Sequence, residues 1–534
     1  MRFFVCASPS LKIYLHKQSI ILSPLPMQRT LYFLAVLLVT LTVIISCQPG
    51  KSNVDHVIKK PNVIVLLADD LGYGDLTCYN KHAKLSTPNI DQLADNGLLF
   101  TDAHANASVC TPTRYGLLTG RYCFRTRLKK SVLTGYSDPL ISESRSTLAS
   151  MYKKIGYQTA CIGKWHLGLG WTKADTTEEL ITGGEWNPTD INIDFKKELW
   201  NTPNNYGFDY SYIIGGSLDM PPYCYVENRK VVGEIDTELY QQEEERGIFW
   251  RKGPGNSSFE MSKALPTFVA KSLDYIAKRD KEKPFFMYLP LPTPHTPWVP
   301  NEKFENTSGA GNYGDFIQQF DSHVGELVAT LKNEGILDNT ILVITSDNGA
   351  AWKSSDLEQW GHNANYYWKG QKADIWEGGH RIPFVVHWPE TIKEPKVTHQ
   401  LLSLTDLYAT LAQISGISVG DDEAEDSYDL SSVLYGIKGD TTLRDHIIHH
   451  SGSGMFGIRY NNWKYIDDLG SGGFTSPQEV EIDSTRKTII QAQLFDFKVD
   501  SLEHFNVVNE FPNEVKILKE KLLELAIDNP SSKH

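Results

Sequence analysis

Apolar runs that end directly in polar residues recur along this chain. They lie at residues 62–68 (NVIVLLA), 159–162 (TACI), 284–291 (PFFMYLPL) and 341–345 (ILVIT). An unbroken apolar run of this length is typical of a strand that helices bury on both faces. We therefore predict strands of a mostly parallel sheet at these four positions.

Helical patterns fill the gaps between these runs. Before the fourth run, apolar residues recur every three or four positions and so share one helical face: Phe316, Phe320, Val324, Leu327 and Leu331. Gly335 is expected to end that helix just before the next strand. Residues 147–155 and 262–279 show similar patterns. Alternating strands and helices predict an α/β fold, a sandwich with a large mixed sheet between helices.

Polar side chains follow the predicted ends of these strands. Asp69 and Asp70 follow the first run, Lys164 and His166 the second, His295 the third, and Asp347 and Asn348 the fourth. In open α/β sheets, ligands bind beyond the carboxyl ends of the strands. The gathering of carboxylates, amines and imidazoles at these ends predicts a functional site at that edge of the sheet.

The pattern changes near residue 440. Short strand-like runs lie at 446–448, 456–459, 463–466 and 494–496, and a helical pattern covers about 513–527. These features predict a small antiparallel sheet with one helix against it. We therefore expect a large domain over residues 61–440 and a C-terminal subdomain over residues 441–534.

The N-terminal region has the pattern of an export signal. Residues 31–45 are apolar or small, and this run is shorter than the ~20 residues of a membrane span. Residues 44–47 (IISC) resemble a bacterial lipobox, which predicts a signal peptide over 1–47, a lipidated Cys47 and a tether over 48–60. The protein would then be exported, as a periplasmic or outer-membrane-anchored lipoprotein whose only membrane contact is the lipid. The alternative is an ordinary signal peptide with a chance cysteine. A start at Met27 would give either signal peptide a normal layout, so we expect that the true start codon is there.

Charge and cysteine content narrow the functional classes. The formal net charge is −13 and the pI is about 5.7, which argues against general nucleic-acid binding but not against a small anionic substrate. No two cysteines have CxxC spacing, which argues against a zinc site. Exclusion of Cys6, Cys47 and Cys110 leaves four cysteines that are either buried free thiols or disulfide partners: Cys78, Cys123, Cys161 and Cys224.

Residues 110–120 read CTPTRYGLLTG. This Cys-x-Pro-x-Arg motif, followed by Leu-Leu-Thr-Gly, resembles the signature of type I sulfatases, members of the alkaline phosphatase superfamily. Further motifs appear in the order of that family: Asp69-Asp70, Gly163-Lys164-Trp165-His166, Pro294-His295, Asp347-Asn348-Gly349, Lys372 and Glu377-Gly378-Gly379. The resemblance covers roughly residues 60–530. It implies an alkaline-phosphatase-like α/β sandwich and a bacterial carbohydrate sulfatase.

The resemblance also implies how the reaction begins. In this family a separate maturation enzyme oxidises the motif cysteine, here Cys110, to formylglycine. The aldehyde hydrates to a diol, and one hydroxyl attacks sulfur to form a covalent sulfate ester, which splits one hard substitution into two easier steps. A predicted helix over 113–118 would place its N-terminus near the developing negative charge. The alternative is a buried structural cysteine.

A metal ion would lower the barrier to attack on sulfur. The sulfate oxygens repel a nucleophile, and a divalent cation withdraws charge from them. The predicted ligands offer oxygen atoms, which suits calcium better than zinc: Asp69, Asp70, Asp347, Asn348 and the modified Cys110. Taken singly, Asp-Asp after a strand can also be a helix cap, and Asp-Asn-Gly a turn. The two motifs together, beside the cysteine motif, favour a metal site.

The resemblance implies roles for the basic residues. Arg114 and Lys164 would hold the diol and the charge beside the calcium ion, and His166 would take the proton of the second hydroxyl. His295 and Lys372 would bind sulfate and protonate the departing alcohol, as a general acid must when the leaving group is a sugar. Lys369 is an alternative to Lys372.

Substrate-binding residues are predicted from composition. Aromatic residues crowd the neighbourhood of Lys372, and Trp352 and Trp360 are candidates for stacking on a sugar ring, whereas core packing is the better interpretation of Trp376. Asp219 lies in a separate stretch that is also expected to face substrate.

These observations predict hydrolysis of a sulfate ester on a carbohydrate. Residues 121–229 resemble bacterial sulfatases that act on galactose or N-acetylgalactosamine sulfates, and this resemblance implies a substrate of that class. The partners are a sulfated glycan and the maturation enzyme. One alternative is a formylglycine-dependent phosphonate or phosphodiester hydrolase, which shares the motif. The other is a catalytically dead, sugar-binding lipoprotein.

Overall fold

A computed structural model describes residues 60–242, 246–248, 250–437, 443–480 and 491–528. Its main feature is a ten-stranded sheet in the order β15-β2-β14-β13-β1-β12-β4-β7-β8-β9. The four predicted apolar runs form β1 (Asn62–Asp69), β4 (Gln158–Lys164), β12 (Phe285–Pro294) and β13 (Thr340–Ser346). The other strands are β2 (Leu98–Phe100), β7 (Tyr210–Ile214), β8 (Val226–Glu227), β9 (Lys230–Val231), β14 (Phe384–His387) and β15 (Lys396–Thr398).

The centre of this sheet is parallel and its edges are mixed. The neighbours β13, β1, β12, β4 and β7 all pair in parallel, whereas β14 and β8 are antiparallel to the strands they flank. The fold prediction of a large, mixed and mostly parallel sheet is therefore confirmed. Because parallel strands end at the same edge, the polar residues after β1, β4, β12 and β13 are brought together.

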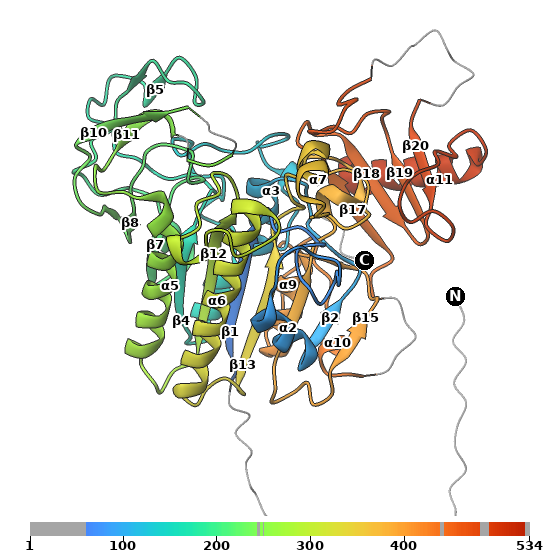
Figure 1. Ribbon diagram of the computed structural model, residues 1–534, viewed down its shortest axis with the longest axis horizontal. Coiled ribbons are helices and arrows are strands. Elements are labelled where there is room, and N and C mark those ends of the chain that lie inside the picture. The colour runs from blue at the N-terminus through green and yellow to red at the C-terminus, as the bar shows by residue number, and fades with distance from the viewer. Residues whose placement is uncertain (1–59, 243–245, 249, 438–442, 481–490, 529–534) are drawn as a thin grey trace, which may run out of the picture. The chain divides into compact units, whose positions relative to one another are not determined.

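Helices cover both faces of the sheet. Ile64 and Leu66 of β1 join one core cluster with residues of α2 (Pro88–Asp95), α5 (Met261–Lys278) and α6 (Gly311–Asn333). Val63 and Val65, which point to the other face, join a second cluster with α3 (Cys110–Thr119), α4 (Leu148–Lys154) and α9 (Asp406–Ile414). Figure 1 shows α5 and α6 side by side over the sheet. This double coverage explains why the strands read as unbroken apolar runs.

The helix predicted from residues 316–331 is confirmed and is longer than its apolar stripe. All five residues of that stripe are buried in α6, which ends at Asn333. Gly335 follows with a φ of 67°, a left-handed conformation that a residue with a Cβ rarely adopts.

The C-terminal sheet is also as predicted. It is antiparallel in the order β17-β18-β19-β20, with bounds His446–His450, Phe456–Tyr460, Trp463–Ile466 and Gln493–Asp496. The helix α11 (Pro512–Leu523) packs against it and continues into a π-helical turn at Glu524–Asp528. The predicted domain boundary at 440 lies among residues 438–442, outside the described residues, as do the predicted signal peptide, Cys47 and the tether up to residue 59.

Smaller elements complete the large domain. They are β3 (Ala103–His104) paired with β16 (Leu402–Ser403), β5 (Ile181–Thr182) paired with β6 (Asp190–Ile191), β10 (Thr237–Gln241) paired with β11 (Trp250–Gly255), and the short helices α7 (Ser354–Trp360), α8 (Glu377–His380) and α10 (Ser431–Leu434). The five cysteines that the structure describes are free thiols. Across the described ranges, no helix has the length and apolar character of a membrane span.

Candidate active site

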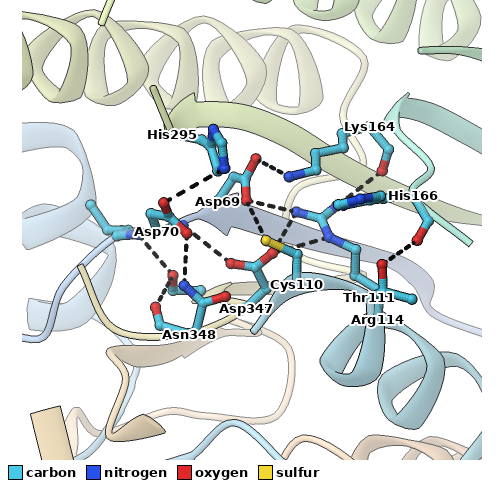
Figure 2. A network of polar contacts seen from close by, with 12 residues as sticks. Asp69, Asp70, Cys110, Thr111, Arg114, Lys164, His166, His295, Asp347 and Asn348 are labelled. Carbon is cyan, nitrogen blue, oxygen red and sulfur yellow. Dashed lines mark hydrogen bonds and ion pairs between the residues drawn. The ribbon is translucent and has the colours of Figure 1, made fainter. Parts of the chain in front are cut away.

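The register of the central strands brings the predicted residues to one place. Asp69, the last residue of β1, pairs with Pro294, so that His295 follows directly beside it. On the other side of β1, Ala68 pairs with Ser346, and the Asp347 amide donates a hydrogen bond to the Ala68 carbonyl at 3.1 Å. Figure 2 shows that these side chains converge.

Cys110 is the first residue of α3 and is buried at the centre of this group. Its thiol lies 3.5 Å from Asp69 Oδ1, and burial raises the pKa of the thiol. The helix is fixed to the turn after β4, because the Thr111 hydroxyl donates to the His166 carbonyl at 2.9 Å and Arg114 Nη1 donates to the Lys164 carbonyl at 2.9 Å. The position of the candidate nucleophile is therefore set by a helix N-terminus and a neighbouring strand end.

Two fully buried ion pairs lie behind Cys110. The Arg114 guanidinium donates to Asp347 Oδ2 through Nε at 3.0 Å and Nη2 at 2.7 Å, and Lys164 Nζ lies 2.7 Å from Asp69 Oδ2. Burial alone would raise the pKa of Asp69, but Lys164, then His295 and Arg114, hold it well below its ordinary value. Burial and the Asp69 charge raise the pKa of Asp347 to about 6. Asp69 and Asp347 thus lie close together, and the positive charges of Lys164 and Arg114 compensate part of their negative charge.

The third carboxylate, Asp70, organises the other side of the site. Lys372 Nζ lies 2.7 Å from Asp70 Oδ1, and the Asn348 amide donates to the same oxygen at 2.7 Å. Burial would lower the pKa of Lys372, but the Asp70 charge outweighs it and raises that pKa. His295 Nε2 lies 3.9 Å from Asp70 Oδ2, and its Nδ1 is 2.6 Å from the Thr296 carbonyl, which fixes Nδ1 as the protonated nitrogen.

His166 is oriented with one ring nitrogen free. Its Nε2 donates to the Leu133 carbonyl at 2.7 Å, and its buried Nδ1 has no hydrogen-bond partner among the described residues. Burial, together with Lys164 and Arg114, lowers the pKa of His166 well below its ordinary value. The ring is therefore neutral and presents an unprotonated Nδ1, which can accept a proton.

Backbone strain also marks this site. Asp70, His166 and Ala373 have φ values of 67°, 55° and 72°, a left-handed conformation that is rare for residues with a Cβ. Ala373 follows Lys372 directly. Such strain costs of order 1–3 kcal/mol per residue and is typical of functional sites. Here it turns the side chains after β1 and β4 toward Cys110.

The donor set fits an oxygen-preferring divalent cation. Ligand atoms of Asp69, Asp70, Cys110 and His295 lie within 4.8 Å of one another. The carbonyl oxygen of the Asn348 side chain is buried and has no partner among the described residues, as expected for a ligand atom. Three carboxylates and one amide oxygen suit calcium or magnesium better than a transition metal.

A cavity of about 1090 Å³ opens in front of Cys110. Asp70, His166, His295 and Lys372 line its inner end. Asp219, which the sequence analysis predicts to face substrate, lines this cavity too. This volume is slightly above the usual range for small-molecule sites, roughly 300–1,000 Å³, so the cavity has room for more than a sulfate group.

Three residues predicted to bind substrate lie elsewhere in the structure. Lys369 Nζ is 4.0 Å from the centre of the Trp376 ring and 3.2 Å from the Glu503 carbonyl, so it faces the C-terminal segment and not the cavity. Trp352 is buried and donates to the His362 carbonyl at 2.8 Å, and Trp360 packs against the same core cluster. These three residues are therefore structural here, and Lys372 is the lysine at the site. Trp376 is buried in the core, as expected.

Several residues of the cavity wall carry no signal that could be recognised in the sequence. Trp186 and Arg251 come from the β5–β6 and β10–β11 hairpins, and Phe474 and Gln478 from the loop after β19. The property that distinguishes Trp186 as a candidate ligand-binding residue is its exposure of 42%, and exposure cannot be recognised in a sequence.

Comparisons with known proteins agree with this geometry. A family model described as Sulfatase matches residues 61–417. The N-acetylgalactosamine-6-O-sulfatase of Bacteroides thetaiotaomicron is 33% identical over 501 residues, which cover 87% of this chain and 93% of that protein. Arylsulfatase D of Homo sapiens is 27% identical over 486 residues, which cover 83% of this chain and 79% of that protein.

A solved structure is similar over nearly the same length. It is described with the metabolism of multiple glycosaminoglycans by Bacteroides thetaiotaomicron, has a TM-score of 0.75 at 32% identity, and matches 88% of this chain and 99% of its own. The family model covers most of the chain, and the site motifs lie within it. This chain is therefore an enzyme of the sulfatase family, in the alkaline phosphatase superfamily.

Proposed function

We propose that this sulfatase removes sulfate from a sulfated sugar, with galactose or N-acetylgalactosamine sulfates as the favoured class. The observation that carries the proposal is the meeting of Cys110 with three carboxylates and three cationic side chains at the inner end of one cavity. The relative named an N-acetylgalactosamine-6-O-sulfatase supports the sugar class. The cavity volume supports a substrate larger than an isolated sulfate ester.

Two chemical groups belong to this proposal. Cys110 would be matured to formylglycine by a separate enzyme, so its Sγ here occupies the place of the oxygen nucleophile. Calcium would be held by Asp69, Asp70, Asp347, Asn348 and residue 110, and it would withdraw charge from the sulfate oxygens. The shared carboxylates and the free Asn348 oxygen support this assignment.

The cationic side chains of the chain have separate tasks. Arg114 and Lys164, each paired with a buried carboxylate, hold the carboxylates and residue 110 in place. Lys372 lines the cavity and is placed to contact sulfate oxygens, where its positive charge favours the anion. This division follows from burial, because Lys164 and Arg114 are fully enclosed whereas Lys372 reaches the cavity surface.

Two histidines would move protons at different stages. His166 Nδ1 is unprotonated and faces the site, so it can take the proton of the second hydroxyl of residue 110 when sulfate is released. His295, with Lys372, would deliver a proton to the ester oxygen that leaves with the sugar. His295 Nδ1 keeps its proton on the Thr296 carbonyl, so the ring would deliver a proton from its charged form, in which Nε2, 3.9 Å from Asp70 Oδ2, carries the second proton.

Export is part of the proposal as well. Residues 1–47 have the pattern of a lipoprotein signal, and a protein lipidated at Cys47 would meet extracellular glycans in the periplasm or at the outer membrane. The lipid would be its only membrane contact. Mass spectrometry of the mature N-terminus would test this, and an unmodified chain that retains residues 1–46 would contradict it.

Replacement of the nucleophile tests the function. Cys110→Ala should abolish sulfate release while the melting temperature stays close to that of the wild type. In the wild type, mass spectrometry of the peptide that contains residue 110 should find formylglycine.

A second experiment should compare turnover on the sulfate and the phosphate ester of one alcohol. Full activity of Cys110→Ala would contradict the mechanism, and faster turnover of the phosphate ester would favour the phosphohydrolase alternative.

A further inference from the structure

The outer part of the cavity wall holds an ion pair that the proposed chemistry does not use. Asp219, in the loop after β7, and Arg251, in β11, both line the cavity. Arg251 Nε and Nη2 each lie 3.0 Å from Asp219 Oδ2. The aspartate is 2% exposed, whereas 43% of the arginine side chain is accessible. A buried carboxylate thus holds a cation that remains accessible from the cavity.

The geometry of this pair leaves part of the guanidinium available. Among the described residues, the Arg251 side chain donates to Asp219 Oδ2, and it does so through Nε and Nη2. The Nη1 group keeps its two N–H donors for a ligand. The other oxygen of Asp219, Oδ1, is buried and has no partner in the same part of the chain. A buried carboxylate with so few partners is costly, which is typical of a functional and not a structural position.

The surroundings of Arg251 fix its orientation further. The Trp186 ring lies on the opposite hairpin, with its centroid 5.5 Å from Arg251 Cζ. The Tyr223 hydroxyl lies 2.9 Å from the Asp219 carbonyl and 2.7 Å from the Arg251 carbonyl, so it ties the two backbones together. Trp186 is 42% exposed and lines the same cavity, where its ring face can stack on a sugar.

The charges of this outer region do not favour a second anion. Its described charged groups are Arg251, Asp219 and Glu479, which leave an excess of one negative charge. The cations that suit sulfate lie deeper, at Lys372 and behind it. An additional sulfate or carboxylate in the outer region would therefore meet a neutralised arginine and a free carboxylate. Uncharged oxygens meet no such repulsion.

We propose that Arg251, held by Asp219 beside Trp186, is a specificity-determining residue that donates hydrogen bonds to uncharged oxygens of the sulfated sugar. A hydroxyl group or an amide carbonyl would satisfy it. The preferred substrate then carries one sulfate and no second anionic group on that ring. This inference rests on the proposed sugar sulfatase function and names the chemistry that the outer cavity selects.

The test compares three kinds of substrate by kcat/KM. They are 4-nitrophenyl sulfate, the 6-sulfates of galactose and N-acetylgalactosamine, and N-acetylgalactosamine 4,6-disulfate. The wild type should prefer the better 6-sulfate over the disulfate by at least about tenfold. Arg251→Ala should lose about 10- to 100-fold on the 6-sulfate, as expected for a hydrogen bond from a charged donor, and much less on the aryl sulfate. Arg251→Lys should recover only part of the loss.

The adjacent residue provides a matched control. Lys252 is an exposed cation on the same strand and pairs with Glu238 at 3.3 Å, away from the cavity lining. Lys252→Ala should keep the wild-type preference among the substrates. Asp219→Asn should raise the rate on the disulfate relative to the 6-sulfate, because it leaves the positive charge of Arg251 uncompensated.

The outcomes separate this inference from the proposed function. Equal losses of Arg251→Ala on aryl and sugar sulfates, or a disulfate preference that Asp219→Asn leaves unchanged, would overturn the role of Arg251 while sugar sulfatase activity stands. A wild type that hydrolyses only the aryl sulfate would overturn both.

Discussion

His295 is positioned to protonate a leaving group, and this role can be separated from sulfate binding. A sugar alkoxide is strongly basic and leaves slowly without a proton, whereas nitrophenolate leaves easily. We expect His295→Ala to lose about 10²–10⁴-fold in kcat/KM on a sulfated sugar and much less on 4-nitrophenyl sulfate. Steady-state kinetics on the two substrates would measure the difference.

A contrast within the site sharpens this prediction. His166 would act on the second hydroxyl of residue 110, after the sugar has left. His166→Ala should therefore accumulate sulfated enzyme, visible as a mass increase, whereas His295→Ala should not. Equal losses of His295→Ala on both substrates would mean that His295 only binds sulfate, and the acid role would pass to Lys372.

The metal assignment gives a prediction with a binding readout. The free side-chain oxygen of Asn348 and the three carboxylates are the expected ligands. Chelated enzyme should be inactive and should regain activity and melting temperature with calcium, because a ligand at 100 times its Kd stabilises the fold by about 2.7 kcal/mol. Asn348→Ala should need more calcium for the same thermal shift. Stoichiometric zinc without calcium in elemental analysis would contradict the assignment.

At the residue scale, the sequence predicted side chains that follow strands and missed those that depend on distant packing. Asp69, Asp347 and His295 follow apolar runs, so their position could be read from the chain. Lys369 and Lys372 could not be separated in this way, because their positions are only three residues apart. The structure separates them by direction: Lys372 faces Asp70, and Lys369 faces Trp376.

Elements with strong periodicity were predictable, and the contacts between elements were not. The strands β1, β4, β12 and β13 and the C-terminal sheet all carry local apolar patterns. The hairpins that bear Trp186 and Arg251 are mostly polar and exposed, so no pattern reveals them. The same holds for the bonds that join the C-terminal sheet to the helix α8, because their partners lie far apart in the chain.

One such bond supports a stability prediction. Lys464 of β19 is fully buried, and its Nζ lies 3.1 Å from Glu377 of α8 and 2.7 Å from Glu503. Lys464→Met would leave two buried carboxylates facing each other, at a cost of about 3–5 kcal/mol in unfolding free energy. Chemical denaturation would measure the loss.

An exposed pair serves as the control for this substitution. Lys519 of α11 lies 2.9 Å from Asp467, and half of its side chain is accessible. Lys519→Met should change the unfolding free energy by about 1 kcal/mol or less, as is usual for surface ion pairs. If Lys464→Met had the same unfolding free energy as the wild type, other contacts would hold β19 and α8 together.

At the scale of the whole molecule, buried histidines make stability depend on pH. Five of them lie in or beside the C-terminal sheet and its junction with α8: His104, His380, His446, His449 and His450. Burial lowers the pKa of all five, to about 4 for His446 and His450. The rings of His380 and His449 stack with centroids 3.6 Å apart, and the cation of Lys464 lies 3.0 Å from His380 Nε2. These neighbours make protonation still less favourable, although Glu377 and Asp102 act in the opposite direction.

The sign of the effect follows from the two states. In the folded protein these rings stay neutral, whereas in the unfolded chain they titrate near pH 6.5. Their contribution is therefore complete above pH 6.5 and is lost as the pH falls toward 4, because the unfolded state then binds more protons. Each histidine contributes at most about 1.4 kcal/mol per pH unit.

We expect the melting temperature to fall steeply between pH 7 and pH 5. His450→Gln removes one such group and should make that slope shallower. His504 is exposed, so His504→Gln should leave the slope unchanged. A melting temperature that is constant or rises between pH 7 and pH 5 would mean that these rings accept protons in the folded protein, and that the packing around α8 and the C-terminal sheet opens to water.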